Sequence, residues 1–308
     1  MRETMIDFRP ITIEDKNIYE KYLFAECEHG CERSFANLYL WGNQRIAFLH
    51  DHIVIFSQFG KYNIYSYPLG NGDITPVIDS LMEDAKERGI HFNLSGLYGN
   101  AKQTLESLYP GMFHFNCDRN SFDYVYDIND LAELKGRKYH RKRNHYNRFR
   151  SNFPNYFIEP FNDSNISQVK EMVDTWYHAR LQENPENDYN LERVALNKAL
   201  CHYKELGMEG LVLINDGRIL AITLGSQISH DTFDVHFEKA LWDVDGAYTA
   251  INCEFAQYIR NKYSHIKFLN REEDMGLEGL RKSKESYYPH HMVEKCRAVL
   301  IDEKAETI

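Results

Sequence analysis

The chain has 308 residues, of which 43% are hydrophobic and 14% aromatic, a composition typical of a folded globular protein. This length exceeds that of an average domain, so two domains are expected. The net charge of −10 excludes a surface that attracts nucleic acid or anionic lipid over most of its area. No apolar run reaches the length of a membrane-spanning helix.

The six cysteines are mostly isolated, which favours reduced thiols over a secreted disulfide scaffold. Cys27, His29 and Cys31 lie close together, but no second pair follows at ligand spacing, so no zinc site is predicted. The first 17 residues are charged and lack the apolar core of a signal peptide. These features predict a cytoplasmic protein without a metal centre.

The first half of the chain is predicted to form one mixed α/β unit. An amphipathic segment at 11–24 precedes strands at 45–50, 52–58 and 62–70, which the short connections predict to be a β-meander. The remaining predicted elements are a helix at 75–88, a strand at 91–94, a helix at 101–108, and strands at 112–116 and 122–126.

The segment 135–150 concentrates positive charge: it holds eight Lys or Arg and two His without one carboxylate, which leaves a balance of −18 elsewhere. It is predicted as a helix joined to a short helix at 128–136 and ended by Ser151, Asn152 and Pro154. Such a cluster would attract and orient a polyanion. The alternative is a solvated helix whose cations pair with acidic neighbours.

The second half repeats the same order of elements, which suggests a duplicated fold with domains at 1–150 and 151–308. Its predicted elements are a strand at 156–161, helices at 165–180 and 191–206, strands at 210–214, 219–227 and 232–238, a helix at 247–263, a strand at 265–270, a helix at 277–286 and a strand at 292–300. Asp216 and Gly217 between two apolar runs predict a type I′ turn.

Polar residues on two neighbouring predicted strands mark a candidate site. Strict alternation in the strand 232–238 places Asp234, His236 and Glu238 on one face, opposite three apolar side chains. A further polar run directly follows the strand 265–270, and in mixed sheets ligand crevices commonly lie beyond such strand ends. A carboxylate or imidazole here could accept a proton from an acceptor amine or hydroxyl. The predicted residues for acceptor binding and proton transfer are His236, Glu238, Asn270, Glu272 and Asp274.

Cations on the following helix and on the basic segment are candidates for binding the donor. Arg281 and Lys284 lie three positions apart, roughly on one helix face, and could contact a donor phosphate or an oxyanion. The alternative is a capped surface helix with ordinary ion pairs. The predicted contacts to a polyanionic donor are Arg137, Lys138, Arg141, Lys142 and Arg143.

Other catalytic motifs are absent from the sequence. It contains no nucleophile elbow, Walker A loop or G-x-G-x-x-G motif. The nearest phosphate-binding turn is 243–249, DVDGAYT, which has one glycine flanked by aspartates and leads into a predicted helix.

Four segments together carry a resemblance to a known family: SFANLYLW at 34–41, LKGRKYHRKRNHYNRF at 134–149, HFEKALWDVDGAYTAIN at 236–252 and NREEDMGLEGLRKSKESYYP at 270–289. The chain resembles the C-terminal catalytic domain of bacterial phosphatidylglycerol lysyltransferases, in a stand-alone form. The resemblance implies an α/β fold of mixed sheets with two tandem GNAT-like acyltransferase domains, which the Fem peptidyl transferases also use. It also implies a basic helix that receives tRNA phosphates, with Tyr139, Tyr146 and Phe149 available for packing or stacking.

The expected function is therefore that of an acyltransferase that moves an aminoacyl group from aminoacyl-tRNA to a lipid hydroxyl or an amine, with no required cofactor. One alternative is a coenzyme A dependent N-acyltransferase acting on a small amine or peptide, although the turn 243–249 departs from the usual coenzyme A loop of GNAT proteins. Another alternative is a non-enzymatic binding module that keeps the fold. The acceptor could be a small molecule, a lipid or a peptide, and a lipid acceptor would require peripheral contact with the membrane.

Overall fold

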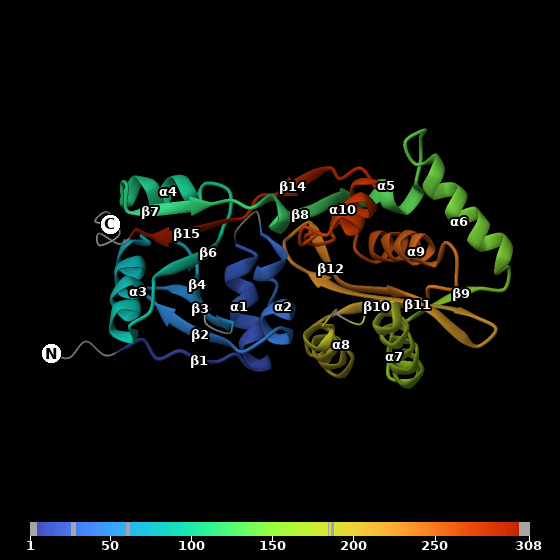
Figure 1. The fold of residues 1–308 in the computed structure, drawn as a ribbon, viewed down its shortest axis with the longest axis horizontal. Coiled ribbons are helices and arrows are strands. Elements are labelled where there is room, and N and C mark those ends of the chain that lie inside the picture. Colours follow the sequence, from blue (N-terminus) through green and yellow to red (C-terminus); the bar gives the residue numbers. More distant parts are fainter. Residues whose placement is uncertain (1–4, 26–28, 60–61, 184, 186–187, 302–308) are drawn as a thin grey trace. The chain divides into compact units, whose positions relative to one another are not determined.

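The computed structural model describes residues 5–25, 29–59, 62–183, 185 and 188–301 (Figure 1). Contacts divide the chain into two compact units. Unit 1 comprises Met1–Asp123 and Val293–Ile308, and unit 2 comprises Tyr124–Met292. This division differs from the predicted domains 1–150 and 151–308, because the basic segment packs within unit 2 and the last strand pairs within unit 1.

Unit 1 contains an eight-stranded mixed sheet. Its strands are β1 (Arg9–Pro10), β2 (Gln44–Leu49), β3 (His52–Phe59), β4 (Tyr62–Ser66), β5 (Leu69–Gly70), β6 (Asn93–Leu97), β7 (Phe113–Asn116) and β15 (Cys296–Leu300). Their order is β1-β2-β3-β4-β6-β15-β7, with β5 paired to β3. The predicted meander is confirmed, since β2, β3 and β4 pair antiparallel in succession. β4 and β6 are parallel.

Helices cover this sheet through apolar side chains at helical spacing. They are α1 (Lys16–Leu23), α2 (Phe35–Leu40), α3 (Thr75–Arg88) and α4 (Ala101–Leu108), with short 3-10 turns at Ile13–Asp15, Cys31–Arg33 and Arg119–Ser121. Val77, Ile78 and Leu81 of α3 are fully buried and share a core with Phe56 and Tyr65 of the sheet. Burial of this apolar face stabilises unit 1.

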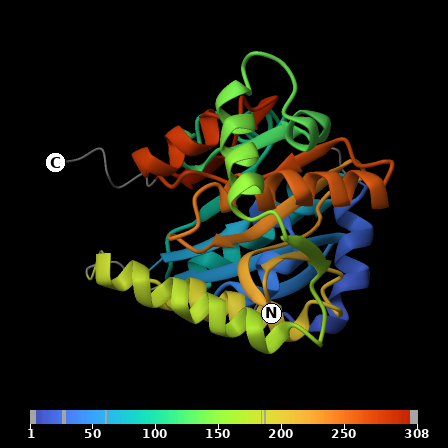
Figure 2. The same ribbon diagram turned by 90° about the vertical axis from the view of Figure 1, so that its right-hand side faces the viewer.

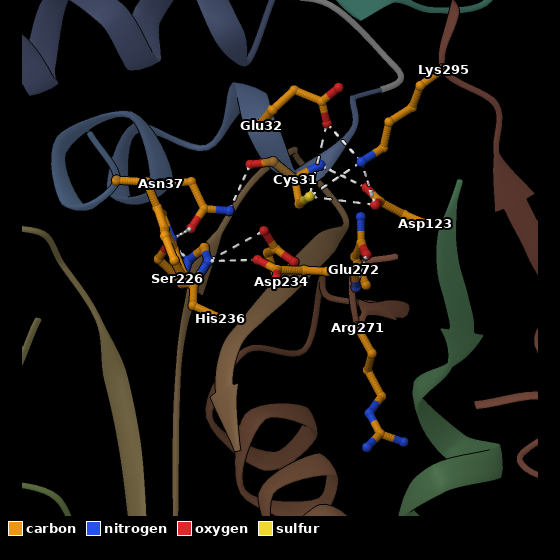
Figure 3. Close-up of polar contacts among 12 residues, drawn as sticks. Cys31, Glu32, Asn37, Asp123, Ser226, Asp234, His236, Arg271, Glu272 and Lys295 are labelled. Atoms are coloured by element: carbon orange, nitrogen blue, oxygen red, sulfur yellow. Dashed lines mark hydrogen bonds and ion pairs between the residues drawn. The ribbon is translucent and has the colours of Figure 1, made fainter. Parts of the chain in front are cut away.

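The strand predicted at 292–300 belongs to the first sheet instead of the second. β15 lies between β6 and β7 and pairs antiparallel with both. Just before it, the buried Lys295 places Nζ 2.6 Å from Asp123 and 2.8 Å from Glu32 (Figure 3). The returning strand is therefore held by ion pairs as well as by its backbone ladder.

A disulfide joins Cys117, just after β7, to Cys296, the first residue of β15. The prediction that all cysteines are reduced is wrong for these two, because the pairing of β15 with β7 brings together residues that are 179 apart in the sequence. Cys31, Cys201 and Cys253 are free thiols. Cys27 lies outside the described residues.

Unit 2 contains a seven-stranded sheet in the order β14-β8-β13-β12-β11-β10-β9. Its strands are β8 (Asp123–Asp127), β9 (Phe157–Pro160), β10 (Glu209–Asn215), β11 (Arg218–Gln227), β12 (Thr232–Ala240), β13 (Phe268–Asn270) and β14 (His291–Val293). The predicted turn between β10 and β11 is confirmed, with φ of 47° at Asp216 and 76° at Gly217. β12 and β13 are parallel.

Helices lie on both faces of this sheet. They are α5 (Ile128–Glu133), α6 (His140–Asn152), α7 (Ile166–Glu183), α8 (Asn190–His202), α9 (Ala247–Lys262) and α10 (Glu278–Glu285). Figure 1 shows α9 on one face of the sheet and α7 and α8 on the other. Helices α5 and α6 pack against α9 (Figure 2). Within the described ranges, no helix combines the length and apolarity needed to cross a bilayer.

Candidate functional site

Strand β12 contains one extra residue at His236. Leu224 of β11 pairs with Phe237, while the next residue, Gly225, pairs with Val235, so His236 is inserted between two successive pairs. A β-bulge of this kind breaks the alternation of side chains and re-aims the residues beside it.

The bulge decides which face Glu238 occupies. Before the bulge, Phe233 packs against an aromatic ring of α9. After it, Glu238 Oε2 accepts a hydrogen bond from Asn252 Nδ2 of the same helix at 3.3 Å. Strict alternation would place these two strand residues on opposite faces. The predicted common face of Asp234, His236 and Glu238 is therefore wrong: the first two stay together and Glu238 lies on the α9 face.

The His236 imidazole is fully buried and contacts groups from three segments (Figure 3). Its Nε2 lies 2.8 Å from Ser226 Oγ of β11. Its Nδ1 lies 3.4 Å from both Asp234 Oδ2 and Glu272 Oε1. Two carboxylates beside Nδ1 would stabilise the positive charge that the ring acquires on taking a proton. The arrangement is therefore suited to general-base chemistry.

Sequence alone does not identify Ser226, and it places Asp234 on the same strand face as His236 without a role in acceptor binding or proton transfer. Ser226 and Asp234 face each other across β11 and β12 as register partners. The contact of Ser226 with His236 depends on strand register and on the bulge, neither of which leaves a signal in the sequence. The polar residues within an apolar strand context were the one available hint.

Glu272 reaches the cluster because the backbone turns sharply after β13. The parallel strands β12 and β13 pair only from Thr232 opposite Phe268 to Asp234 opposite Asn270. Beyond this point Asn270 Oδ1 accepts the Glu272 N–H at 2.8 Å, and Glu272 has a positive φ of 58°. The cluster thus lies where the two strands stop pairing, and Asn270 shapes this turn.

Asp274 is also buried but is saturated by hydrogen bonds. It accepts two bonds from the Arg281 guanidinium at 2.8 Å, one from Tyr124 Oη at 2.5 Å and one from the Gly276 N–H at 2.8 Å. The guanidinium, followed by Tyr124 and the backbone N–H, holds the pKa of Asp274 well below its usual range despite burial. Through these contacts Asp274 and Arg281 stabilise the loop between β13 and α10.

Lys284 is directed into the same loop. Its Nζ donates to the backbone carbonyls of Arg271, Glu272 and Glu273. This ammonium therefore fixes the backbone that presents Glu272, and its observed partners are main-chain oxygens of the protein.

A second polar cluster lies on the α9 face around Glu238. Arg271 Nη2 donates to Glu238 Oε1 at 2.9 Å, and its guanidinium lies over the ring of Tyr287 at 5.0 Å. Lys142 of α6 places Nζ 3.7 Å from the centre of the same ring. Burial, with a contribution from Arg271, lowers the pKa of Lys142 to about 8.

The basic helix α6 has an inner and an outer side. Tyr139 and Phe149 are fully buried, and Tyr146 Oη bonds to Glu254 of α9. These aromatic residues pack within unit 2, and the buried Tyr139 and Phe149 present no face on which a base could stack. Arg143 donates to the carbonyls of the loop before the helix.

The outer side of α6 borders hollows lined by cations. One surface depression has a volume of about 1100 Å³. Its lining residues are Arg137, Lys138, His140, Arg141, Arg143 and Tyr288. A second depression next to it is lined by Arg141, Asn144, His145 and Arg148. Four of the five predicted donor contacts on this segment, all except Lys142, thus lie along one surface.

One set of residues in unit 2 could hold a cation. Asp234, His236 and Glu272 offer three ligand atoms that lie within 4.8 Å of one another. Imidazole and carboxylate ligands suit a divalent ion such as zinc or manganese. The same three groups are those placed for proton transfer.

Comparison with solved structures defines the class of fold. A tandem GNAT protein from the clavulanic acid biosynthesis pathway superposes with a TM-score of 0.51 at 8% identity, covering 96% of this chain and 98% of that one. The predicted fold, two tandem GNAT-like domains with mixed sheets, is confirmed.

The family follows from the sequence. The family described as phosphatidylglycerol lysyltransferase, C-terminal, matches residues 26–299, and the chain belongs to this family. A conserved protein of unknown function from Bacteroides thetaiotaomicron VPI-5482 is 38% identical with a TM-score of 0.92, covering 96% of this chain and 100% of that one. L-PGS from Bacillus licheniformis has the same fold at 16% identity, with a TM-score of 0.66 and coverage of 93% and 92%. No curated protein matches the sequence.

Proposed function

We propose that the protein is a cytoplasmic aminoacyltransferase that takes an aminoacyl group from charged tRNA and transfers it to a lipid hydroxyl or an amine. Membership of the lysyltransferase family supports the class of reaction. The observation that carries the choice of donor is the cationic outer side of α6, where Arg137 and Arg141 line hollows on an otherwise acidic chain. A polyanion would be oriented by this surface.

The proposed reaction is the exchange of one ester for another ester or for an amide. The acceptor oxygen or nitrogen attacks the carbonyl carbon of the aminoacyl ester and loses a proton to His236 Nε2, the ring nitrogen that does not face the two carboxylates. The tetrahedral intermediate then expels the tRNA hydroxyl, which takes up that proton. Asp234 and Glu272 stabilise the imidazolium that forms between the two steps. The proposed reaction consumes no cofactor.

The contacts of α6 favour this donor over coenzyme A. In GNAT proteins coenzyme A binds at the turn before the helix that corresponds to α9. Here Asp245 of that turn pairs with Arg148 of α6 at 2.8 Å. A Cβ at Gly246 would lie 2.6 Å from the backbone oxygen of His145. The helix thus packs against the turn that would otherwise receive a pyrophosphate, which supports a coenzyme-free transfer from tRNA.

The donor is tested by measuring binding of charged tRNA, uncharged tRNA and acetyl coenzyme A in parallel, at low and moderate salt. Both tRNA forms should bind, with an affinity that falls steeply with salt. In the double variant Arg137→Ala/Arg141→Ala the slope of log affinity against log salt should fall by about two. Lys267→Ala, which removes an exposed cation elsewhere in unit 2, should bind as wild type. Failure of both tRNA forms to bind, or salt-resistant binding of acetyl coenzyme A alone, overturns the proposed donor.

A second measurement distinguishes a transferase from a non-enzymatic binding module. Transfer from charged tRNA to extracted lipid and to soluble amines should be detectable with the wild-type chain. If tRNA binds but no acceptor is modified, and His236→Gln keeps the biological activity, the protein is a binding module.

A further inference from the structure

Three metal-ligating side chains of unit 2, those of Asp234, His236 and Glu272, converge at the end of β13 (Figure 3). The side chains of Asp234 and His236 are fully buried, and that of Glu272 is 24% exposed. Two ionised carboxylates beside one imidazole carry a net negative charge even when the ring is protonated. Burying such charge is costly unless a cation neutralises it. We propose that this cluster binds a zinc ion, and that the bound ion switches off the proposed transfer.

The separations within the cluster match the edges of a coordination tetrahedron. Ligands that lie about 2.1 Å from a tetrahedral zinc ion are about 3.4 Å from one another. His236 Nδ1 lies 3.4 Å from Asp234 Oδ2 and 3.4 Å from Glu272 Oε1. A hydrogen bond from a charged imidazole to a carboxylate is shorter, about 2.7–2.9 Å. The three groups are therefore spaced as zinc ligands are, and more widely than closed ion pairs.

The groups behind the ligands hold two of them in place. His236 Nε2 lies 2.8 Å from Ser226 Oγ. A histidine that binds a metal usually donates its second ring N–H to a fixed acceptor, which sets its tautomer and orientation. The Glu272 N–H donates to Asn270 Oδ1 at 2.8 Å, and its carbonyl accepts from Lys284 Nζ at 3.0 Å. The imidazole and the backbone of Glu272 are thus oriented before an ion arrives.

The types of ligand select the ion. Imidazole suits zinc and other transition metals, whereas magnesium and calcium prefer oxygen ligands alone. Three protein ligands leave the fourth position of a zinc ion to water. The partly exposed Glu272 provides the route of entry. Figure 3 shows Arg271 directed away from the cluster, and its guanidinium donates to Glu238 instead, so this neighbouring cation does not take the place of the ion.

Zinc binding and proton acceptance require different tautomers of His236. As a base, the neutral ring carries its proton on Nδ1, beside the carboxylates, and its lone pair on Nε2. As a zinc ligand, it bonds through the Nδ1 lone pair and carries its proton on Nε2, which then donates to Ser226 Oγ. A zinc-bound ring has no lone pair for the proton of the acceptor. This part of the proposal rests on the proposed function.

Titration calorimetry with zinc, manganese and magnesium chlorides tests the site on the full chain, after metal is removed with a chelator. Zinc should bind at one site, manganese more weakly, and magnesium should give no binding. Asp234→Asn and Glu272→Gln should each weaken zinc binding about tenfold or more, since even the partners of metal ligands contribute that much. Glu272→Gln alters a partly exposed side chain and serves as the test if Asp234→Asn does not fold.

An exposed pair of histidines provides the matched control. His290 and His291 place their Nδ1 atoms 2.9 Å apart. The double variant His290→Gln/His291→Gln should bind zinc as wild type. Loss of binding in this variant together with wild-type binding in Glu272→Gln would show an adventitious ion only. That outcome, no zinc binding by the wild type, or an anomalous diffraction peak away from His236 in zinc-soaked crystals would each overturn the site.

Inhibition is measured separately from binding. Zinc should stop transfer from charged tRNA with half-inhibition near its measured Kd, and a chelator should restore transfer. Transfer that continues in zinc-saturated protein overturns the inhibition and leaves the site standing. If the cluster binds zinc but the zinc-free chain transfers no aminoacyl group, the proposed function fails, the inhibition falls with it, and the zinc site stands.

Discussion

At the scale of single residues, His236 has the contacts expected of a proton acceptor. It is buried, Ser226 fixes one ring nitrogen, and two carboxylates lie 3.4 Å from the other. The imidazole therefore has little freedom to rotate, and charge on it is balanced by neighbours. A group held in this way is preorganised for general-base catalysis.

Replacing His236 by Gln should reduce kcat for aminoacyl transfer by about 10²- to 10⁴-fold, because the side chain keeps a polar group but cannot take a proton. The affinity for tRNA should not change, since the basic outer side of α6 is untouched. Single-turnover transfer with saturating charged tRNA measures the effect. His178→Gln, at an exposed position on α7, is the matched control. A kcat close to wild type in H236Q would remove His236 from the mechanism.

We expect Asp274 to contribute to stability, because its carboxylate accepts hydrogen bonds from Arg281, Tyr124 and the Gly276 N–H. Its carboxylate is held in the charged form, so Asp274→Asn should lower the free energy of unfolding at pH 7 by about 2–3 kcal/mol. The pKa of Asp274 is lower in the folded protein than in the unfolded chain. Its charged carboxylate therefore contributes fully to the free energy of unfolding above the pKa of the unfolded chain, about 4, and this contribution is lost as the pH falls further.

Urea denaturation of wild type and D274N at pH 7 and near pH 3 checks this pH dependence. The difference in free energy of unfolding between the two proteins should shrink at the lower pH. Asp243→Asn, which removes an exposed ion pair with Arg218, should change the free energy of unfolding by less than about 1 kcal/mol. A gap that grows on acidification contradicts the assignment.

The candidate site was predictable only in part. The sequence located His236, Glu272 and the end of β13, because polar residues in an apolar strand context stand out. It could not separate the roles of Asp274 and Lys284, which depend on loop closure through tertiary contacts. It also could not place Glu238, because a bulge shifts the face of every later residue and leaves no mark in the pattern of side chains.

At the scale of elements, the docking of α6 on the turn before α9 connects the basic surface to the rest of unit 2. Gly246 has φ of 84°, and a Cβ there would also lie 3.0 Å from Phe149 Cβ. Arg148 pairs with Asp245 beside it. Glycine therefore serves both the left-handed backbone and the close approach of the helix.

Gly246→Ala should destabilise the protein by about 2–4 kcal/mol, the sum of left-handed strain and of the collision with α6. Gly217→Ala is the matched control: it has φ of 76° but open space around the new methyl group, so it should cost only about 1–2 kcal/mol. Denaturation curves give both values. tRNA affinity should fall in G246A and not in G217A, and equal affinities would show that docking of α6 does not control the basic surface.

Local signals predicted most elements. The bounds of α3 and α4, the meander in unit 1 and the turn at 216–217 agree with the sequence, since each depends on residues close together in the chain. The partners of β15 do not follow from local sequence, because the strand pairs with segments about 200 residues earlier. Long-range pairing is set by whole-sheet packing, which residue periodicity does not record.

At the scale of the whole molecule, unit 2 is inserted between β7 and β15 of unit 1. The Cys117–Cys296 disulfide ties the two ends of this insertion together within unit 1. A boundary placed by element order alone, at residue 150, could not anticipate an insertion. The order of helices and strands along the chain is the same whether the second unit follows the first or is inserted into it.

Loss of the disulfide should destabilise unit 1. Cross-linking residues 179 apart restricts the unfolded chain, so Cys117→Ser should lower stability by roughly 3–5 kcal/mol in the chain-entropy account. Hydrogen exchange under non-reducing conditions should show lower protection in β6, β7 and β15 than in wild type, with β10–β12 unchanged. Cys201→Ser, an exposed free thiol, is the control. Two free thiols at these positions by intact mass, in protein purified without reductant, would contradict the bond.

The position of β15 also has a consequence for synthesis on the ribosome. Since β15 lies between β6 and β7, these two strands have no partner on their facing edges until residues 296–300 have emerged. The nascent chain must therefore carry an open gap in its first sheet while all of unit 2 is translated. Unpaired strand edges promote association between chains, so translation stalled before Cys296 should yield an aggregation-prone nascent protein even if unit 2 has already folded.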